Sequence, residues 1–387
     1  MIQKRILQVI RPAEGGMKGH LLTLAGGLIN RGYLVEVACP GDSSLAAELR
    51  EMGLRVHPIS LVGPLSPGPD LICVLELRNI FRHGQYDIIH FHGAKAGMVG
   101  RIATALTGCL NTVVTVHNFI VYEEVPWPKK ILFRYGEQFL SRVTNRIITV
   151  SKALRDDLVL NYKIRPEKIT PIYNGIDTLR FQQTQHSESA RAILGISPSA
   201  VAVGTVARMA SQKGLNYLVE AFARMYRAGQ VSPDDTAFVI AGDGPLRPQL
   251  EKQADDLGIR DKIIFPGFVD DMPLFLACLD VFVVPSVAEG LSISTIEAMA
   301  AGLPVVASRV GGLPELVRTE ETGFLVEPRN PTELAEAIFR LLTDSETRKQ
   351  MGINGRKLAI QQFNTENMIE QTCALYNEML KQQACAN

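Results

Sequence analysis

Short apolar runs alternate with amphipathic stretches along most of this chain of 387 residues. A first series of runs, each expected to form a strand, covers residues 5–10, 33–38, 54–59, 87–92, 112–116, 146–150 and 169–173. A second series covers residues 200–206, 237–241, 262–265, 281–284, 305–307 and 324–326. Strands that alternate with helices pair in parallel, because each helix carries the chain back to the edge where the next strand begins. The sequence therefore predicts an α/β fold with two doubly wound parallel sheets.

The alternation is interrupted by a polar stretch at residues 178–189, which follows neither the strand nor the helix period and is predicted to be a linker. A chain of this length fits two domains of roughly 150 to 200 residues each. We expect an amino-terminal domain over residues 1–180 and a carboxy-terminal domain over residues 181–365. A final helix, residues 366–387, is expected to pack back on the first domain through apolar residues near helical spacing. These residues are Met368, Ile369, Leu375, Tyr376, Met379 and Leu380.

The composition is that of an ordinary globular protein. Forty Lys and Arg residues balance forty Asp and Glu residues, which gives no support for electrostatic binding of nucleic acid. The six cysteines are scattered without metal-like spacing, which indicates free thiols in a reducing compartment. The apolar run before Arg11 is too short for a signal peptide, and no run is long enough to span a membrane. We expect a cytoplasmic protein, and peripheral contact with the inner face of the membrane stays open.

Glycines and histidines follow the predicted strands of the first domain. Gly15 and Gly16 follow the first strand and open a helix, where they could bind phosphate or simply form a tight turn. His90, His92 and His117 lie at or just after the ends of two strands, and His90 and His92 share one face because side chains alternate along a strand. Without an accompanying carboxylate or cysteine, polar substrate contact or a structural role is favoured over a metal site.

The second domain has cations and carboxylates at its strand ends. Arg208 and Lys213 lie in the loop after its first strand, before a helix start at Gly214, which suits a diphosphate; solvated basic residues are the alternative. Ser294 to Glu297 fits the capping box Ser-x-x-Glu. Glu289 has no such local role and could accept hydrogen bonds from sugar hydroxyls.

Three motifs appear in an order typical of one enzyme family. They are EGLSISTIEAMAAGLPVVAS at 289–308, GGLPELV at 311–317 and TGFLVEP at 322–328. The family pattern also includes Gly15-Gly16, HFH at 90–92, TVH at 115–117, NGID at 174–177, Arg208 and Lys213-Gly214. With these motifs the whole chain resembles the retaining nucleotide-sugar glycosyltransferases of family four. The resemblance implies a GT-B fold, in which two Rossmann-like domains face each other across a cleft.

The resemblance also implies the roles of individual residues in binding a nucleotide-sugar donor. Arg208 and Lys213 would hold the donor diphosphate, Glu297 the ribose, and Glu289 the transferred sugar. The full set of implied donor-binding residues is Gly16, Arg208, Lys213, Glu289, Gly290, Leu291 and Glu297. The catalytic set is His117, Glu289, Arg208 and Lys213, with His117 close to the sugar and the acceptor hydroxyl.

The implied reaction transfers a sugar to an acceptor hydroxyl with retention at the anomeric carbon. Double displacement would need a carboxylate nucleophile beneath that carbon. No residue clearly fills this position, although Glu289 is a conceivable nucleophile. We favour same-face attack, in which the leaving phosphate takes the acceptor's proton. No metal and no cofactor are expected, because two cations and a helix amino terminus can neutralise the leaving group. A nucleotide-sugar epimerase and a non-catalytic sugar-nucleotide binding protein are the rival hypotheses.

The acceptor is unknown, and its site is expected in the loops of the first domain. The acceptor-side candidates are Lys18, His20, His92 and Lys95. Lys18 replaces an acid that is common in the family, which could suit an anionic acceptor. The segment 121–142 carries the only tryptophan, Trp127, beside several cations. It could lie on a membrane surface, although its glutamates favour a partly solvated helix packed on the first sheet.

Overall fold

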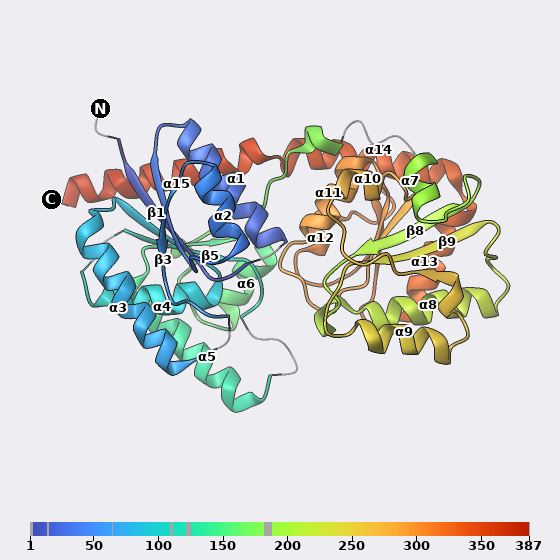
Figure 1. The fold of residues 1–387 in the computed structure, drawn as a ribbon, viewed down its shortest axis with the longest axis horizontal. Coiled ribbons are helices and arrows are strands. Elements are labelled where there is room, and N and C mark those ends of the chain that lie inside the picture. The colour runs from blue at the N-terminus through green and yellow to red at the C-terminus, as the bar shows by residue number, and fades with distance from the viewer. Residues whose placement is uncertain are drawn as a thin grey trace. The chain divides into compact units, whose positions relative to one another are not determined.

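The computed structural model describes residues 3–13, 15–63, 65–108, 111–120, 125–181 and 188–386. The chain divides into two compact units (Figure 1). The first unit combines residues 1–175 with residues 365–387, and the second comprises residues 176–364. No helix in the described part of the chain is both long and apolar enough to span a bilayer.

The first unit contains a seven-stranded parallel sheet in the order β3-β2-β1-β4-β5-β6-β7. Its strands are β1 Arg5–Ile10, β2 Leu34–Cys39, β3 Arg55–Pro58, β4 Ile88–His92, β5 Thr112–Val116, β6 Arg146–Thr149 and β7 Ile169–Pro171. Its helices are α1 Gly16–Asn30, α2 Ser44–Glu51, α3 Pro67–Gly84, α4 Gly93–Ala105, α5 Trp127–Leu140, α6 Lys152–Leu160 and α15 Thr365–Ala386, with short 3₁₀ helices η1 Ser141–Val143 and η2 Pro166–Lys168. Helices α1, α2 and α15 cover one face of the sheet, α3 and α4 cover the other, and α5 packs on α4 (Figure 1).

The second unit contains a six-stranded parallel sheet in the order β10-β9-β8-β11-β12-β13. Its strands are β8 Val201–Val206, β9 Thr236–Ala241, β10 Ile263–Ile264, β11 Val281–Val284, β12 Val305–Ser308 and β13 Gly323–Val326. Its helices are α7 Glu188–Ile193, α8 Leu215–Arg227, α9 Arg247–Asp256, α10 Met272–Leu276, α11 Ile293–Ala301, α12 Leu313–Leu316, α13 Pro331–Thr343 and α14 Ser345–Gln362, with 3₁₀ helices η3 Thr178–Phe181, η4 Ser211–Lys213 and η5 Arg260–Lys262. Helices α8 and α13 pack together on one face of the sheet, and α11 packs with α14 on the other.

The predicted fold class, two doubly wound parallel sheets, is confirmed. Every predicted strand is present, with ends that differ by a residue or two, because a buried parallel strand is a nearly continuous apolar run. The polar stretch at 178–189 is not wholly irregular: η3 occupies its first residues, and α7 begins at Glu188. Residues 182–187 of that stretch lie outside the described residues.

Both cores are built from side chains of a sheet and its covering helices. In the second unit, Phe222 of α8 stacks on Phe238 of β9 with ring centroids 3.8 Å apart. In the first unit, Ile369 of α15 packs so closely on α1 that a Cβ at Gly27 would lie 2.1 Å from its terminal methyl carbon. The carboxy-terminal helix is therefore part of the first unit's core.

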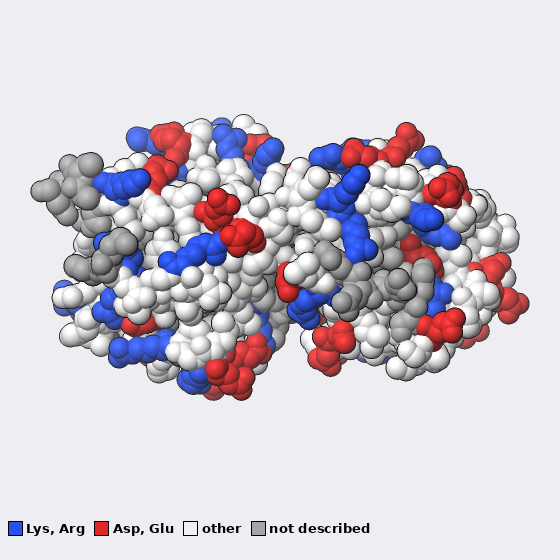
Figure 2. Space-filling view, turned by 90° about the horizontal axis from the view of Figure 1, so that it is seen from above, with Lys and Arg blue, Asp and Glu red and all other residues white. Residues whose placement is uncertain are grey.

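The molecular surface mixes both signs of charge. On the face shown in Figure 2, basic and acidic side chains are interspersed among uncharged residues, without a continuous field of one sign. Four cysteines, Cys39, Cys73, Cys278 and Cys373, are free thiols, as the sequence predicted, and all four are buried. Cys109 and the side chain of Cys385 lie outside the described residues.

Candidate active site

Three loops of the first unit meet where the strand order reverses. Gly15 has a φ of 61°, a left-handed conformation that favours glycine, and Gly16 begins α1 just after β1. In the sheet register, Ile10 pairs with His92, and His92 pairs with Thr115. The loops after β1, β4 and β5 therefore share one edge, at the switch point where doubly wound sheets bind ligands.

Histidines gather at this edge. The rings of His90 and His92 lie 4.3 Å apart between centroids, which confirms that the two side chains share a face. His20 of α1 lies 4.8 Å from the ring of His117 and 5.5 Å from that of His92. The structure thus brings together three candidates from the sequence, His20, His92 and His117.

A buried chain of hydrogen bonds orients His92. Its Nε2 lies 2.7 Å from the side-chain oxygen of Gln8, so this nitrogen carries the proton. The other ring nitrogen, Nδ1, is then an acceptor and lies 3.4 Å from Nε2 of His117. The Gln8 amide in turn donates to the Tyr376 hydroxyl of α15 over 3.3 Å. The tautomer of His92 is therefore fixed from the carboxy-terminal helix.

Burial keeps these histidines neutral. It lowers the pKa of His20 to about 4, and it lowers the pKa of both His92 and His117 well below the usual value, with neighbouring histidines adding to the effect. Both ring nitrogens of His20 and the side-chain oxygen of Asn174 are buried without a hydrogen-bond partner among the described residues. Asn174 is close enough to favour the charged form of His20, but no hydrogen bond of normal geometry joins them.

Neutral imidazoles are metal ligands, and in the described part of the chain the ligand nitrogens of His20, His92 and His117 lie within 4.8 Å of one another. This group differs from the one considered in the sequence. His90 is engaged elsewhere, with its two nitrogens 2.6 Å from the hydroxyls of Tyr376 and Thr115. A tetrahedral zinc ion holds ligand atoms roughly 3.3 Å apart, a spacing that the 3.4 Å between His92 and His117 approaches.

The second unit brings Lys213 and Glu289 into contact. The Lys213 Nζ donates to the Glu289 carboxylate over 2.6 Å. Gly214 makes this possible: it has a φ of 62°, and a Cβ there would lie 2.1 Å from the carbonyl oxygen of Pro285. The loops after β8 and β11 are also joined by two backbone bonds from 287 and 288 to the Gln212 carbonyl.

Glu289 is a buried carboxylate with one oxygen engaged. Its exposed fraction is 5%, and the oxygen that meets Lys213 also accepts from the Ser286 hydroxyl over 3.2 Å. Its backbone carbonyl accepts from the Gly312 amide over 3.2 Å. Gly290 and Leu291 complete the loop that leads from β11 to α11. The side chain is therefore oriented, and its second oxygen has no hydrogen-bond partner among the described residues.

Arg208 is exposed on the loop after β8 and has no hydrogen bond or ion pair from its side chain among the described residues. Two glycines shape this loop, because Cβ atoms at Gly242 and Gly244 would lie 2.0 Å and 2.6 Å from the carbonyl oxygens of Ala207 and Met209. This supporting role of the two glycines was not among the roles predicted from the sequence. The pair of glycines after a buried strand was the available signal.

The predicted capping box at Ser294 and Glu297 is wrong. Helix α11 begins two residues earlier than that pattern requires, and its cap is Ser292, whose hydroxyl accepts from the Thr295 amide over 3.2 Å. Glu297 therefore lies in the second turn, and its carboxylate has no hydrogen-bond partner in the described structure. Burial raises its pKa to about 7, against the opposing charge of Arg180.

The two lysines proposed for the acceptor side have protein partners. Lys18 is 2.6 Å from Glu48 and donates to Ser44 over 3.2 Å, so it faces α2. Lys95 is buried in an ion pair with Asp70 of α3. The structure does not group either lysine with the histidines.

Family models match both halves of the chain. One described as glycosyltransferase family 4 matches residues 14–180, and one described as glycosyl transferases group 1 matches residues 187–358. A UDP-Gal:alpha-D-GlcNAc-diphosphoundecaprenol alpha-1,3-galactosyltransferase of Escherichia coli is 30% identical over 355 residues, which cover 91% of each chain. The chain belongs to glycosyltransferase family 4. The resemblance seen in the sequence is thus confirmed.

Other relatives of this family 4 glycosyltransferase act on different acceptors. A D-inositol 3-phosphate glycosyltransferase of Acidothermus cellulolyticus is 30% identical over 403 residues, covering 96% of this chain and 87% of that protein. Among solved structures, Anabaena HepE in complex with UDP-glucose superposes with a TM-score of 0.83 at 24% identity, over 97% of this chain and 99% of that one. The fold is GT-B, and the protein is a glycosyltransferase.

Proposed function

We propose that this glycosyltransferase transfers a hexose from a UDP-sugar to a hydroxyl of a glycan carried on a polyprenyl diphosphate. The contact between Lys213 and Glu289, with the exposed Arg208 on the same loop as Lys213, is the observation that carries the donor assignment. The Escherichia coli relative, named for a UDP-galactose donor and a diphosphoundecaprenol acceptor, supports the choice of donor and acceptor. Such an acceptor places the reaction at a membrane surface in envelope glycan synthesis.

In this proposal the second unit binds the donor. Arg208 and Lys213 neutralise the diphosphate, together with the amino terminus of α8. Glu289 accepts from hydroxyls of the hexose through its open oxygen, and Glu297 accepts from the ribose hydroxyls. These contacts stabilise the charge that develops on the leaving diphosphate and hold the sugar in one orientation.

The proposed chemistry is same-face substitution without a bound metal ion. The bond between the anomeric carbon and the diphosphate oxygen breaks, and its electron pair leaves with UDP. The acceptor oxygen forms the new bond on the same face of the sugar, and its proton passes to the leaving phosphate. His117 and its neighbours, held neutral, contact the sugar and the acceptor hydroxyl. Lys213 and Ser286 hold Glu289 beside the sugar as an orienting group rather than as a nucleophile.

A donor panel tests this proposal. Purified protein is mixed with UDP-, GDP- and ADP-hexoses, and we expect one UDP-hexose to raise the melting temperature and to be hydrolysed slowly, with the anomeric configuration retained in the NMR spectrum of the product. Excess chelator should leave the rate unchanged. Lys213→Ala and Glu289→Ala should each reduce hydrolysis by at least about a hundredfold. Wild-type rates in both variants, or a ring-inverted sugar as product, would contradict the proposal.

A further inference from the structure

Helix α5 has its apolar side chains on the outside. Only Glu137 and Leu140 of this helix are buried. Trp127 and Leu132 expose 72% and 71% of their surface, and Tyr135, Phe139 and Ile131 are exposed as well. Large side chains of this kind normally face the core. A helix with this orientation presents an apolar face that needs a partner.

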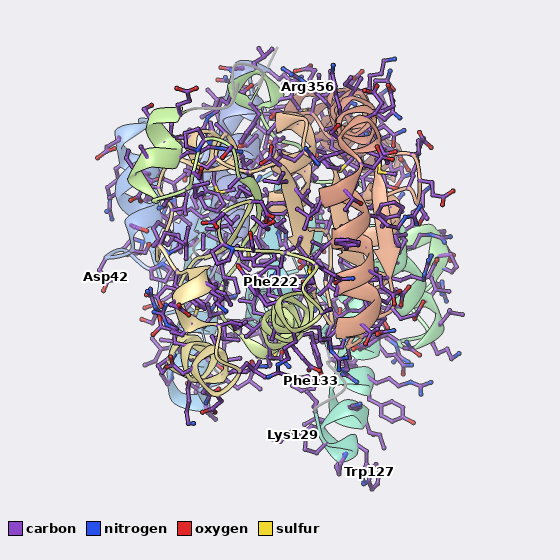
Figure 3. All side chains as sticks on the ribbon, turned by 90° about the vertical axis from the view of Figure 1, so that its right-hand side faces the viewer. Asp42, Trp127, Lys129, Phe133, Phe222 and Arg356 are labelled. Atoms are coloured by element: carbon purple, nitrogen blue, oxygen red, sulfur yellow. The ribbon has the colours of Figure 1, made fainter. Side chains whose placement is uncertain are left out.

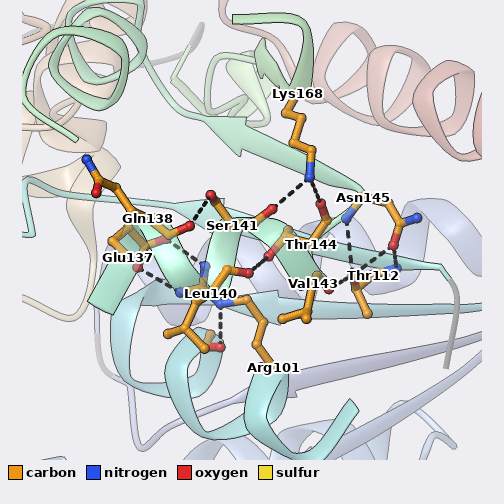
Figure 4. Close-up of polar contacts among 11 residues, drawn as sticks. Arg101, Thr112, Glu137, Gln138, Leu140, Ser141, Val143, Thr144, Asn145 and Lys168 are labelled. Carbon is orange, nitrogen blue, oxygen red and sulfur yellow. Dashed lines mark hydrogen bonds and ion pairs between the residues drawn. The ribbon is translucent and has the colours of Figure 1, made fainter. Parts of the chain in front are cut away.

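A buried ion pair fixes this orientation. Glu137 accepts two hydrogen bonds from the guanidinium of Arg101 on α4, over 2.6 and 2.8 Å (Figure 4). Arg101 is 1% exposed, and its Nε also donates to the Gly97 carbonyl over 2.7 Å. Because breaking a buried pair costs several kcal/mol, α5 cannot roll its apolar face inward without losing this contact.

The end of α5 is held by a second set of polar contacts. The Thr144 hydroxyl donates to the Leu140 carbonyl over 2.8 Å. The Lys168 ammonium donates to the carbonyls of Ser141 and Thr144 over 2.7 and 2.9 Å (Figure 4). The helix is thus anchored to α4 through its polar side and to η2 through its carboxyl end. Its exposed apolar face is a fixed feature of the first unit.

The exposed residues form a ridge with cations on either side. Trp127, Ile131, Tyr135 and Phe139 are four residues apart and therefore lie in one row along the helix, with Leu132 beside them. At 100° per residue, Lys129 and Arg134 fall on opposite sides of this row, and both are exposed. Figure 3 shows Trp127 at the outer end of α5, with Lys129 close by.

We propose that this α5 ridge, Trp127, Ile131, Leu132, Tyr135 and Phe139, lies in the plane of an anionic membrane surface. Aromatic side chains prefer the boundary between headgroups and acyl chains, and flanking cations attract acidic lipids. The cations on both sides of the ridge favour an anionic bilayer over an uncharged partner. The acidic residues 123 and 124 precede the ridge but lie outside the described residues. The inference rests on the proposed function, which places the acceptor in a membrane.

Trp127 makes a direct test simple, because it is the only tryptophan in the chain. The full-length protein is titrated with vesicles of phosphatidylglycerol and phosphatidylcholine in equal parts, and with vesicles of phosphatidylcholine alone. With the anionic vesicles we expect the Trp127 emission to move to shorter wavelength, brominated lipid to quench it, and the protein to sediment with the lipid. Binding to uncharged vesicles should be much weaker, and salt should weaken binding to the anionic ones.

Matched variants separate the ridge from general surface properties. Leu132→Ser should weaken vesicle binding by roughly tenfold, whereas Leu160→Ser on α6, an equally exposed leucine of the same unit, should not. Lys129→Glu with Arg134→Glu should also weaken it by about tenfold or more. The control for this change of net charge is Lys349→Glu with Lys357→Glu on α14, where both lysines are exposed.

Two results would overturn the proposal. One is an unchanged Trp127 emission with anionic vesicles. The other is a dimer in sedimentation velocity that Leu132→Ser dissociates, which would assign the ridge to a second copy of the chain. Hydrolysis of the UDP-hexose should be the same in all these variants, so it reports on the proposed function separately. Vesicle binding without hydrolysis would refute the proposed function but support membrane binding by the ridge. Hydrolysis without vesicle binding would refute membrane binding by the ridge and leave the proposed function intact.

Discussion

At the scale of single residues, Glu289 and Glu297 show how one chemical group can have two different environments in one unit. Glu289 is the more buried of the two, but Lys213 and Ser286 supply hydrogen bonds to its carboxylate. Glu297 has no such partner, and burial raises its pKa to about 7. A ligand that donates hydroxyl groups would favour the ionised form of Glu297.

Glu297 therefore makes donor affinity depend on pH. Because the ribose hydroxyls would bind the ionised carboxylate, we expect UDP to bind more tightly as the pH rises through about 7. Glu297→Gln should bind UDP roughly tenfold more weakly at pH 8 and should lose this pH dependence. Calorimetric titration from pH 5.5 to 8.5 measures both effects. The control is Glu336→Gln on α13, whose side chain is exposed; an equal effect there would refute the assignment.

The same carboxyl group makes the folded protein less stable as the pH rises, whereas it makes donor binding tighter. Because the pKa of Glu297 is raised in the folded state, its contribution to the free energy of unfolding is fully present below pH 4.5 and is lost as the pH rises towards about 7. Glu297 keeps part of its surface exposed, so we expect Glu297→Gln to raise the free energy of unfolding by about 2 kcal/mol at pH 8 and by little at pH 4.5. Urea unfolding at the two pH values measures this difference. A carboxylate kept at such a cost is consistent with a binding role.

At the scale of secondary structure, α15 orients side chains that are far away from it in the sequence. The hydroxyl of Tyr376 lies 2.6 Å from Nδ1 of His90 and accepts from Gln8, which in turn orients His92. Tyr376 is fully buried, so its hydroxyl has no water to replace it. It is a positioning residue for the histidines rather than a group that contacts substrate.

Tyr376→Phe keeps the ring in the core and removes this hydroxyl. Without it Gln8 is free to turn, so we expect the imidazole nitrogens of His92 to give NMR shifts of mixed tautomers and kcat to fall roughly tenfold, with KM for the donor nearly unchanged. The control is Tyr33→Phe, which removes a hydroxyl bonded to Asn377 on the exposed side of α15, over 3.2 Å. A single His92 tautomer together with full activity in Tyr376→Phe would exclude the positioning role.

The strands and some of the site could be predicted from sequence, and the contacts that tie α15 to the histidines could not. Strand ends place His92 and His117 at one edge, because parallel sheets put all their carboxyl ends together. The link from Gln8 to Tyr376 spans 368 residues and depends on how α15 packs, which no local pattern encodes. The capping box failed because Ser292 and Ser294 both offer a hydroxyl three residues before a polar side chain. For α5, helical periodicity gives an apolar face but not the side that faces out, which the Arg101 to Glu137 pair decides.

At the scale of the whole molecule, one unit is formed from a single segment of the chain and the other from two. The second unit is one continuous segment, residues 176–364, whereas the first joins residues 1–175 to residues 365–387. The helix from the end of the chain contributes Met368, Ile369 and Tyr376 to the first unit's core, each with no more than 3% of its surface exposed. The two units should therefore differ in how they tolerate separation.

We expect a fragment of residues 176–364 to fold alone and to bind UDP, because it keeps its whole core and the pair of Lys213 and Glu289. A fragment of residues 1–175 should not fold. Each of the core side chains that α15 supplies contributes about 1.5 to 3 kcal/mol when buried, and several of them together exceed much of the 5 to 15 kcal/mol that typically stabilises a protein. Circular dichroism and amide dispersion in NMR spectra measure folding, and a synthetic peptide of residues 365–387 should restore it in the amino-terminal fragment. Cooperative unfolding of that fragment without the peptide would show that α15 is dispensable for the folding of the first unit.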